Sequence, residues 1–317
     1  MVKLIWGVVE KLLSVALLAF IGSAAVFFIM HIGPGDPALA VLGDQATAET
    51  IAAFRTHWHL DEPVFIQYVL WLKQAIFGDF GTSLTMTTGT PVQTLLEQRI
   101  PATIFIGMLA IALSILISLL GGTISVMWHR RFGDTISTSL AAVGISMPDF
   151  WIAYVLIYFF ALRAGWFPAY GYVSPSISIL EALHSAFLPA VAIAAPMAAV
   201  FTRILRTSLL ENLYKEHVLV ARSFGHSKSF VFLHHILRNA LIPYVTVIGL
   251  QIRYLLGGTV VIERIFGIPG IGNLMVDAAF ARDFPVVQAC ALVFLLGVLT
   301  VNFIVDIVCT ILNPRGR

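Results

Sequence analysis

Charged side chains are scarce in this sequence. Asp, Glu, Lys and Arg make up 11% of the 317 residues, whereas 59% are hydrophobic and the mean hydropathy is +0.92. Because a typical soluble domain is about one quarter charged, this composition excludes a soluble globule and predicts a membrane protein. The net charge of +2 gives no sign of a nucleic-acid-binding surface.

Cysteine is also scarce. The two cysteines, Cys290 and Cys309, both belong to the last apolar stretch of the chain, and on a single helix they would lie about 28 Å apart. That separation is far beyond the reach of a disulfide. The cysteines therefore say nothing about the redox compartment.

Several enzyme motifs are missing. No Gly-Lys dipeptide occurs, which excludes the phosphate-binding loop Gly-x-x-x-x-Gly-Lys-Ser/Thr, and "GHSKS" lacks its spacing. The metalloprotease motif His-Glu-x-x-His is also absent. No Ser, His and Asp constellation and no pair of carboxylates can be placed on one aqueous face. We therefore assign no catalytic residue.

Long apolar runs are what the sequence does contain. Four uncharged runs cover residues 12–30, 102–127, 185–202 and 284–305. Two further runs are each interrupted by a single charge. The interrupted runs are residues 135–160 with Asp149 and residues 239–262 with Arg253. A membrane-spanning helix needs about 20 residues. The sequence therefore predicts an all-α polytopic membrane protein with six transmembrane helices.

The basic residues predict the orientation. With six spans both termini share one side of the membrane, and that side carries twelve Lys and Arg, in the N-terminal arm, residues 128–134, residues 203–238 and the tail, against six on the opposite side. Lys and Arg are retained on the cytoplasmic side, so both termini are predicted to be cytoplasmic. The first apolar run exceeds the roughly 7–15 residues of a signal-peptide core, which indicates an uncleaved helix.

We divide the chain into three regions: an N-terminal arm with the first helix (residues 1–32), an extracytoplasmic helical segment (33–100) and a five-helix core (101–317). The extracytoplasmic segment is too rich in periodic apolar residues to be disordered, and Pro63 separates two predicted amphipathic helices. Their apolar positions are Ile51, Phe54 and Trp58, then Tyr68, Trp71, Leu72 and Ala75. These aromatics suit the membrane interface and packing within the loop equally well.

Two histidines of this segment, His57 and His59, stand one residue apart. On a helix they diverge, and no third ligand is near in sequence. We therefore predict no metal site.

A polar stretch, "VARSFGHSKSFVFLHHILRNALIP" at residues 220–243, falls in the longest cytoplasmic loop. Gly225 is typical of a helix end and Ser227 of a helix N-cap. In the second predicted helix the apolar arc holds Phe230, Leu233, Ile236, Leu237, Ala240 and Leu241. Val231 and Phe232 fall on the polar side, which favours a docking role. A helical hairpin lying on the membrane surface fits the periodicity equally well.

The segment "ARSFG", followed after a polar turn by "LRNALIP", resembles the cytoplasmic coupling motif of permease subunits in bacterial ATP-binding-cassette (ABC) importers. Ala221 and Gly225 stand at that motif's Ala and Gly, whereas Val220 and Arg222 depart from its usual acidic residue and second alanine. Five further segments resemble, in order, the branch that imports peptides and nickel: "GPGDPA", "HLDEPVFIQYVLWL", "GDFGTS", "PVQTLLEQRIPATI" and "ERIFGIPGIGNLMVDAAFARDFPVVQ".

This resemblance implies a type I importer permease in the bacterial inner membrane, whose loop 203–240 seats in a separate ATPase. It implies no cofactor in this chain, ATP and Mg bound by two ATPase subunits, a homologous second permease and an extracytoplasmic binding protein. The implied substrates are di- or oligopeptides, with nickel or a metal chelate as the alternative. Outside this class, a membrane-embedded enzyme or scaffold is the competing interpretation. The implied coupling residues are Ala221, Arg222, Gly225, His226, Ser227, Val231, Phe232 and His235.

The two intramembrane charges are candidate substrate-pathway residues, because an ionisable group inside a span is costly. Arg253 near the middle of the fifth run could face a substrate carboxylate. The alternative is a buried pair of Arg253 with Asp149 that fixes helix packing. Asp149 follows Pro148, a position that also indicates a kink.

Overall fold

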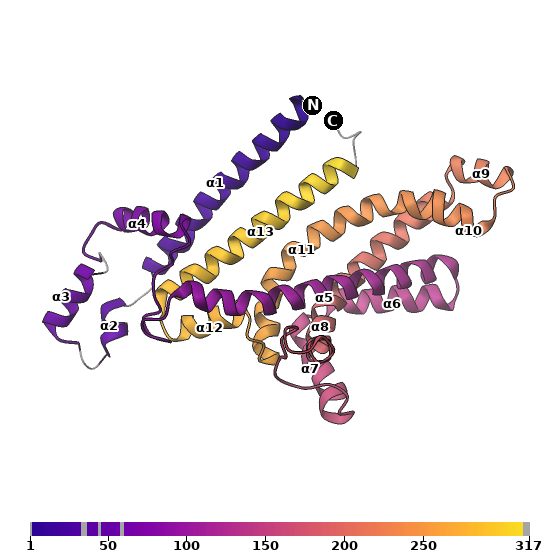
Figure 1. Ribbon diagram of the computed structural model, residues 1–317. Coiled ribbons are helices and arrows are strands. Elements are labelled where there is room, and N and C mark those ends of the chain that lie inside the picture. Colours follow the sequence, from indigo (N-terminus) through magenta and orange to yellow (C-terminus); the bar gives the residue numbers. More distant parts are fainter. Residues whose placement is uncertain (1, 33–36, 44–45, 58–59, 313–317) are drawn as a thin grey trace. The chain divides into compact units, whose positions relative to one another are not determined.

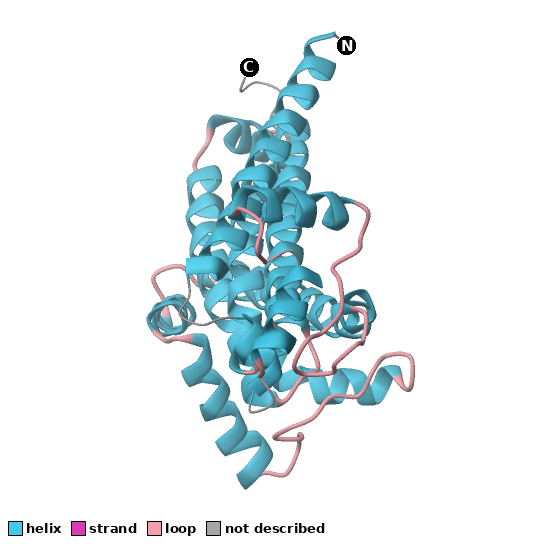
Figure 2. Cartoon of the chain, turned by 90° about the vertical axis from the view of Figure 1, so that its left-hand side faces the viewer, coloured by secondary structure: helices cyan, strands magenta, loops and turns pink. Residues whose placement is uncertain are grey.

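The computed structural model describes residues 2–32, 37–43, 46–57 and 60–312, and these are helical apart from loops and one isolated bridge between Thr82 and Pro91 (Figures 1 and 2). The all-α prediction is confirmed. The helices are α1 (Val2–Ile32), α2 (Pro37–Leu42), α3 (Ala48–His57), α4 (Val64–Ile76), α5 (Val92–Met127), α6 (Phe132–Ser146), α7 (Asp149–Leu156), η2 (Ile157–Arg163), α8 (Ile179–Leu213), α9 (Glu216–Ser223), α10 (Lys228–Val231), η3 (Phe232–Leu237), α11 (Arg238–Phe266), α12 (Ile271–Phe280) and α13 (Phe284–Leu312).

Five helical stretches in the described part of the chain are long and apolar enough to cross a membrane, and each overlaps a predicted run. They are Glu10–Ile29, Val92–Met127, Ile179–Leu213, Lys228–Ile252 and Phe284–Val308. Two bent helix pairs raise the number to seven if each pair is one span. The predicted six falls within this range and stays a prediction.

The third predicted span, residues 135–160, is not one continuous helix. Phe132–Ser146 and Asp149–Arg163 meet at an angle of 110°. Pro148, which stands between the two helices in an extended conformation, lacks the N–H that would continue the hydrogen-bond ladder, and it disfavours helical geometry in the residue before it. The expectation of a kink at this position is therefore confirmed.

The chain divides into two compact units. The first comprises Met1–Thr103 and Pro269–Thr300, and the second comprises Ile104–Ile268 and Val301–Arg317. In the first unit a buried apolar cluster joins the start of α5 to α12 and α13 through Val92, Leu96, Leu274 and Val286. The helices α3 and α4 lie on either side of Pro63, as predicted.

A buried carboxylate fastens the loop before α5 to the turn before α13 within the first unit. Asp283 is fully buried, and its Oδ2 accepts a hydrogen bond from Ser83 Oγ at 2.6 Å. The same oxygen accepts bonds from the backbone N–H groups of Leu84, Thr85 and Met86, each at 3.1 Å. Four donors on one oxygen satisfy a polar atom that would be costly to bury without partners. This clamp joins segments about 200 residues apart in sequence.

The helix α8 forms the centre of the second unit, where it packs against α6, α7 and α11. Its buried residues include small ones, such as Ala190 and Ala194, and large ones, such as Phe201 and Leu205. Small residues let helices approach closely where lipid offers no hydrophobic driving force. On α11, Tyr244 is 2% exposed and stacks edge-on against Phe201.

Candidate functional site

The polar stretch forms a helical hairpin between α8 and α11 in the second unit (Figure 1). The helix α9 follows α8 after a short turn, and α10 continues through η3 into α11. Ser227 caps α10, since its Oγ accepts a hydrogen bond from Phe230 N at 3.3 Å. The predicted helix end at Gly225 and cap at Ser227 are both confirmed. We refer to residues 216–237 as the α9–η3 hairpin.

Gly225 occupies the turn of the hairpin in the left-handed region, at φ +78°. A Cβ atom placed on it would meet no other atom within 4 Å. The glycine is therefore required by the backbone conformation and not by crowding. An ordinary L-residue would pay roughly 1–2 kcal/mol in this region. Ala221, by contrast, is 5% exposed and belongs to the interior of the hairpin.

The π-helical hydrogen bonding of η3 changes which side chains face inward. A π-turn advances the chain with i→i+5 bonds instead of i→i+4, so Val231, Ile236 and Ala240 come to lie on one face. All three are buried, at 1%, 2% and 0% exposure. Phe230 and Leu233, which were predicted on the apolar arc, are exposed. The predicted docking role of Val231 therefore needs correction: its side chain supports the hairpin from inside.

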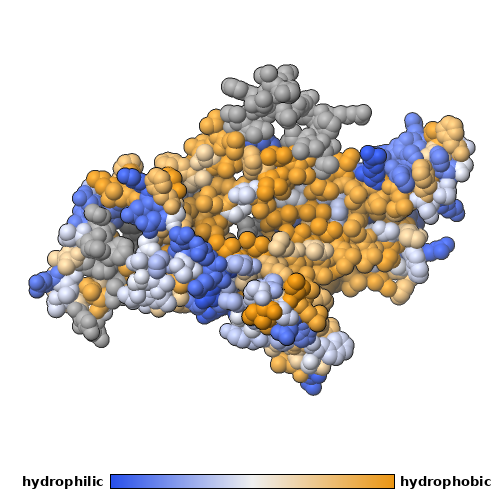
Figure 3. Space-filling view, in the orientation of Figure 1, coloured by the Kyte–Doolittle hydropathy of each residue, from blue (hydrophilic) through white to orange (hydrophobic). Residues whose placement is uncertain are grey.

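Three exposed rings form a column along the outer side of the hairpin. The His226 and Phe230 rings stack with centroids 4.7 Å apart, and the Phe230 and His234 rings stack at 4.3 Å. Phe224, at 78% exposure, adds a further uncovered aromatic in the turn. Sequence reasoning placed His226 in the site but missed this column, although the spacing of four residues between its members was visible. Hydrophilic residues gather over α9 and α10 in Figure 3.

Exposed polar contacts link α9 to η3 and to the start of α11. Asn239 Nδ2 donates to the backbone oxygen of His235 at 2.8 Å and lies 3.3 Å from His217 Nε2. The rings of His217 and His235 are 6.5 Å apart. His235 and Phe232 are both half-buried. Of the predicted coupling residues, the exposed ones are Arg222, Gly225, His226 and Ser227.

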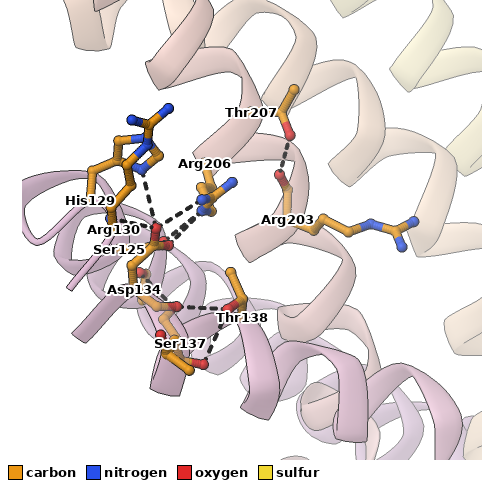
Figure 4. Close-up of polar contacts among 11 residues, drawn as sticks. Ser125, His129, Arg130, Asp134, Ser137, Thr138, Arg203, Arg206 and Thr207 are labelled. Carbon is orange, nitrogen blue, oxygen red and sulfur yellow. Dashed lines mark hydrogen bonds and ion pairs between the residues drawn. The ribbon is translucent and has the colours of Figure 1, made fainter. Parts of the chain in front are cut away.

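An ion pair that the sequence analysis did not foresee joins α6 to α8 (Figure 4). The Arg206 guanidinium binds both carboxylate oxygens of Asp134, with Nε 2.8 Å from Oδ1 and Nη2 2.9 Å from Oδ2. Ser125 Oγ also donates to Oδ1, and the Arg130 N–H donates to Oδ2 at 3.0 Å. His129 Nδ1 lies 3.1 Å from Oδ2.

This ion pair is largely shielded from water. Asp134 is 6% exposed as a residue, and the side chains of Asp134 and Arg206 keep 9% and 23% of their surface exposed. A two-point guanidinium–carboxylate contact is among the stronger and more directional polar contacts in proteins. Because Arg206 is on the helix that leads into the hairpin, the pair ties the hairpin's supporting helix to α6.

Of the two predicted pathway residues, the structure describes the side chain of Asp149 but not that of Arg253. Asp149 begins α7, and its Oδ1 accepts a hydrogen bond from Phe150 N at 2.8 Å. A Cβ atom placed on Gly258 of α11 would lie 3.0 Å from Asp149 Oδ2, so α7 and α11 approach closely here. Arg253 belongs to α11, but its side chain lies outside the described part of the chain, as do the side chain of His57 and all of His59.

Comparison with known proteins decides the family. Residues 114–317 match the family described as binding-protein-dependent transport system inner membrane component, and residues 1–107 match the N-terminal family of the same membrane components. The chain belongs to this permease family. Together the two matches cover nearly all of the permease, including the α9–η3 hairpin.

Curated relatives are similar over almost their full length. The permease is 36% identical over 312 residues to the probable peptide ABC transporter permease protein y4tP of Sinorhizobium fredii, covering 98% of both chains. It is 35% identical over 310 residues to the glutathione transport system permease protein GsiC of Escherichia coli (strain K12), again covering 98% of both.

Solved structures support the fold. The permease resembles a chain from the crystal structure of an amino acid ABC transporter with histidines, with a TM-score of 0.54 and 16% identity over 68% of this chain and 93% of that one. It also resembles a chain of the inward-facing MetNI methionine ABC transporter, with a TM-score of 0.55 and 14% identity over 69% and 96% of the two chains. The expected ABC importer permease fold is therefore confirmed.

Proposed function

We propose that this permease forms half of a translocation pathway for di- or oligopeptides delivered by an extracytoplasmic binding protein. The observation that carries the substrate class is the full-length similarity to permeases named for peptide and for glutathione, since glutathione is itself a tripeptide. These names favour peptides over nickel. The second permease is a homologous chain, and both termini of this one are cytoplasmic.

The α9–η3 hairpin is the proposed contact with an ATPase subunit that binds ATP and Mg. Its exposed surface combines the ring column with the basic residues Arg222 and Lys228. Such a surface fits a partner groove that offers acidic groups at its rim and an apolar pocket for an aromatic side chain.

The connections of the hairpin suggest how movement would reach the membrane helices. The hairpin continues directly into α8 and α11, and Val231 and Ile236 anchor it internally. The Asp134–Arg206 pair makes α6 follow α8. When the ATPases close on nucleotide, the hairpin moves as a rigid lever and biases the spans between inward-open and outward-open arrangements.

The substrate class is tested by titrating the cognate binding protein with dipeptides, glutathione and Ni²⁺ in parallel, followed by uptake into proteoliposomes containing the whole complex. We expect peptide binding and ATP-dependent peptide uptake. Binding of Ni²⁺ alone would overturn the peptide assignment.

The assembly is tested by the mass of the detergent-extracted complex. We expect one copy of this chain, one homologous permease and two ATPase subunits. Two copies of this chain as the only permeases would contradict the proposal.

A further inference from the structure

The short helix α4 (Val64–Ile76) of the first unit is apolar, and much of its apolar surface is uncovered. Its 13 residues extend about 20 Å, less than the roughly 30 Å of a hydrocarbon core. Phe65 and Ile76 are nevertheless 69% and 72% exposed, and Phe77 directly after the helix is 83% exposed. Large apolar side chains exposed side by side on one helix indicate contact with something other than water.

Two aromatic residues of α4 contact α1: Trp71, whose ring lies 5.6 Å from that of Phe27, and Tyr68, which makes most of the contacts. Tyr68 is 2% exposed, and its hydroxyl lies 2.9 Å from Ser23 Oγ and donates to the backbone oxygen of Phe20 at 3.3 Å. Its ring packs against those of Phe27 and Phe28, with centroids 5.4 and 5.7 Å away. These partners belong to the second half of Glu10–Ile29, a membrane-crossing stretch. α4 therefore lies beside the C-terminal half of α1 (Figure 1).

Viewed from Tyr68, α4 has an apolar flank and a flank that carries its two glutamines, and its one charged residue, Lys73, falls at about 140°, beyond the apolar flank on the side away from Tyr68. At 100° per residue, Phe65, Val69 and Ile76 fall at about 60°, 100° and 80° on one flank. Gln67 and Gln74 fall at about 100° and 120° on the opposite flank. Gln67 Nε2 donates to the backbone oxygens of Leu60 and Glu62 at 3.2 and 2.8 Å, so this flank is joined to a polar loop.

We propose that α4 lies in the membrane–water interface, parallel to the bilayer surface, with the Phe65, Val69 and Ile76 flank in the hydrocarbon and the Gln67 and Gln74 flank toward water. α4 is held to a membrane-crossing helix by one side, and its apolar and polar flanks lie at about right angles to that side. This is the pattern of an interfacial helix. The occupant of the apolar flank is acyl chain. With both termini cytoplasmic, as proposed above, these acyl chains belong to the extracytoplasmic leaflet. Only the choice of leaflet rests on the proposed function.

Continuity with α1 favours lipid over a protein partner. Phe20 and Ile21, at 53% and 54% exposure, and Ile29, at 66%, are uncovered on the same half of α1 that holds α4. Acyl chains cover such positions on a membrane-crossing helix wherever no protein segment does. The apolar flank of α4 extends the same surface sideways. α1 and α4 together then present a wider lipid-facing surface than α1 alone.

The test uses the whole complex in lipid nanodiscs, with a nitroxide spin label at single cysteines in a Cys290→Ala, Cys309→Ala background. Phe65→Cys and Ile76→Cys report the apolar flank, and Gln74→Cys is the matched control on the same helix. We expect the first two labels to be accessible to oxygen and at least tenfold less accessible to a water-soluble nickel chelate than the Gln74 label. Equal chelate accessibility at all three positions would overturn the proposal.

Protein occupants give different results. Shielding of the Phe65 and Ile76 labels from both oxygen and the chelate would indicate the second permease and overturn the lipid assignment. Protection that appears only when the binding protein is added would indicate that protein instead, with the same consequence. Uptake by the same complexes reports the proposed function separately, because accessibility does not depend on the substrate.

A lipid-soluble photoactivated carbene probe checks the unmodified protein. We expect label on Phe65, Val69 and Ile76 and little on Gln67 and Gln74. Equal labelling of both flanks, or none on the apolar flank, would contradict the interfacial position even if the cysteine variants did not assemble.

Discussion

Arg206 holds Asp134 at two points, with Nε and Nη2 2.8 and 2.9 Å from the two carboxylate oxygens, and so joins α8 to the first turn of α6. The partners are 72 residues apart in sequence. Because the α9–η3 hairpin follows α8 after a short turn, this contact braces against α6 the helix that carries the hairpin.

Breaking this pair should destabilise the complex. Arg206→Met removes the two-point guanidinium partner of a buried carboxylate, which costs about 3 kcal/mol for pairs of this kind. The double variant Arg206→Met, Asp134→Asn should regain a large part, because the uncompensated charge is gone. Thermal unfolding of the purified complex measures both. The exposed Arg203, whose side chain points away from Asp134 in Figure 4, supplies the control Arg203→Met, which should change the unfolding temperature little.

The turn of the hairpin should tolerate asparagine better than other residues. Gly225 has φ +78° and free space around its Cβ position, so the strain comes from the backbone. Asn adopts this conformation far more readily than a β-branched residue. We expect Gly225→Asn to keep most coupling, and Gly225→Val and Gly225→Trp to reduce ATPase copurification and peptide uptake with the membrane helices intact. Normal copurification and uptake in Gly225→Trp would rule out the coupling assignment.

Two apolar residues of the hairpin should respond differently to truncation. Val231→Ala removes buried packing and should cost about 1 kcal/mol or more of hairpin stability. Phe224→Ala removes a 78% exposed ring and should leave stability unchanged but weaken ATPase binding. Unfolding and copurification are measured for both. Unchanged ATPase binding in Phe224→Ala would exclude this ring from the interface.

The sequence predicted those features that local chemistry determines. Gly225 and Ser227 end and begin helices because their own conformational and capping preferences act over a few residues, and Pro148 breaks a span for a similar reason. The burial of Val231 could not be predicted in the same way. It depends on a π-turn that shifts the helical phase, and the hydropathy of residues 228–241 fits an unshifted α-helix equally well.

Long-range contacts were also beyond sequence reasoning. Arg206 counted as one of many basic residues on the cytoplasmic side, and nothing near Asp134 in the sequence indicated that the two would meet. The only sequence feature that could have indicated the ion pair was the position of Asp134, an acidic residue directly before the predicted span at residues 135–160. The Asp283 clamp was missed for the same reason, since Ser83 lies 200 residues away.

The Asp283 clamp should be essential for the first unit. Asp283→Ala removes the acceptor of four hydrogen bonds and leaves Ser83 Oγ and three backbone N–H groups without it, which costs about 3 kcal/mol or more. We expect lower membrane yield and a lower unfolding temperature. Asp79→Ala is the control, because Asp79 makes an exposed bond to Gly81 N. Equal behaviour of the two variants would show that the clamp contributes little.

The role of Arg253 is open to a decisive experiment. We predict that it faces the translocation pathway, since an unpaired guanidinium in hydrocarbon costs at least about 2.5 kcal/mol. If it attracts a substrate carboxylate, Arg253→Lys should keep part of the peptide flux and Arg253→Met little, because Lys keeps the charge but loses the planar fork. A structural pair with Asp149 predicts instead that Arg253→Met lowers complex stability and that adding Asp149→Asn restores it. Flux and thermal stability should be measured for the single and double variants. Wild-type flux in Arg253→Met, with the complex intact, would refute the pathway assignment.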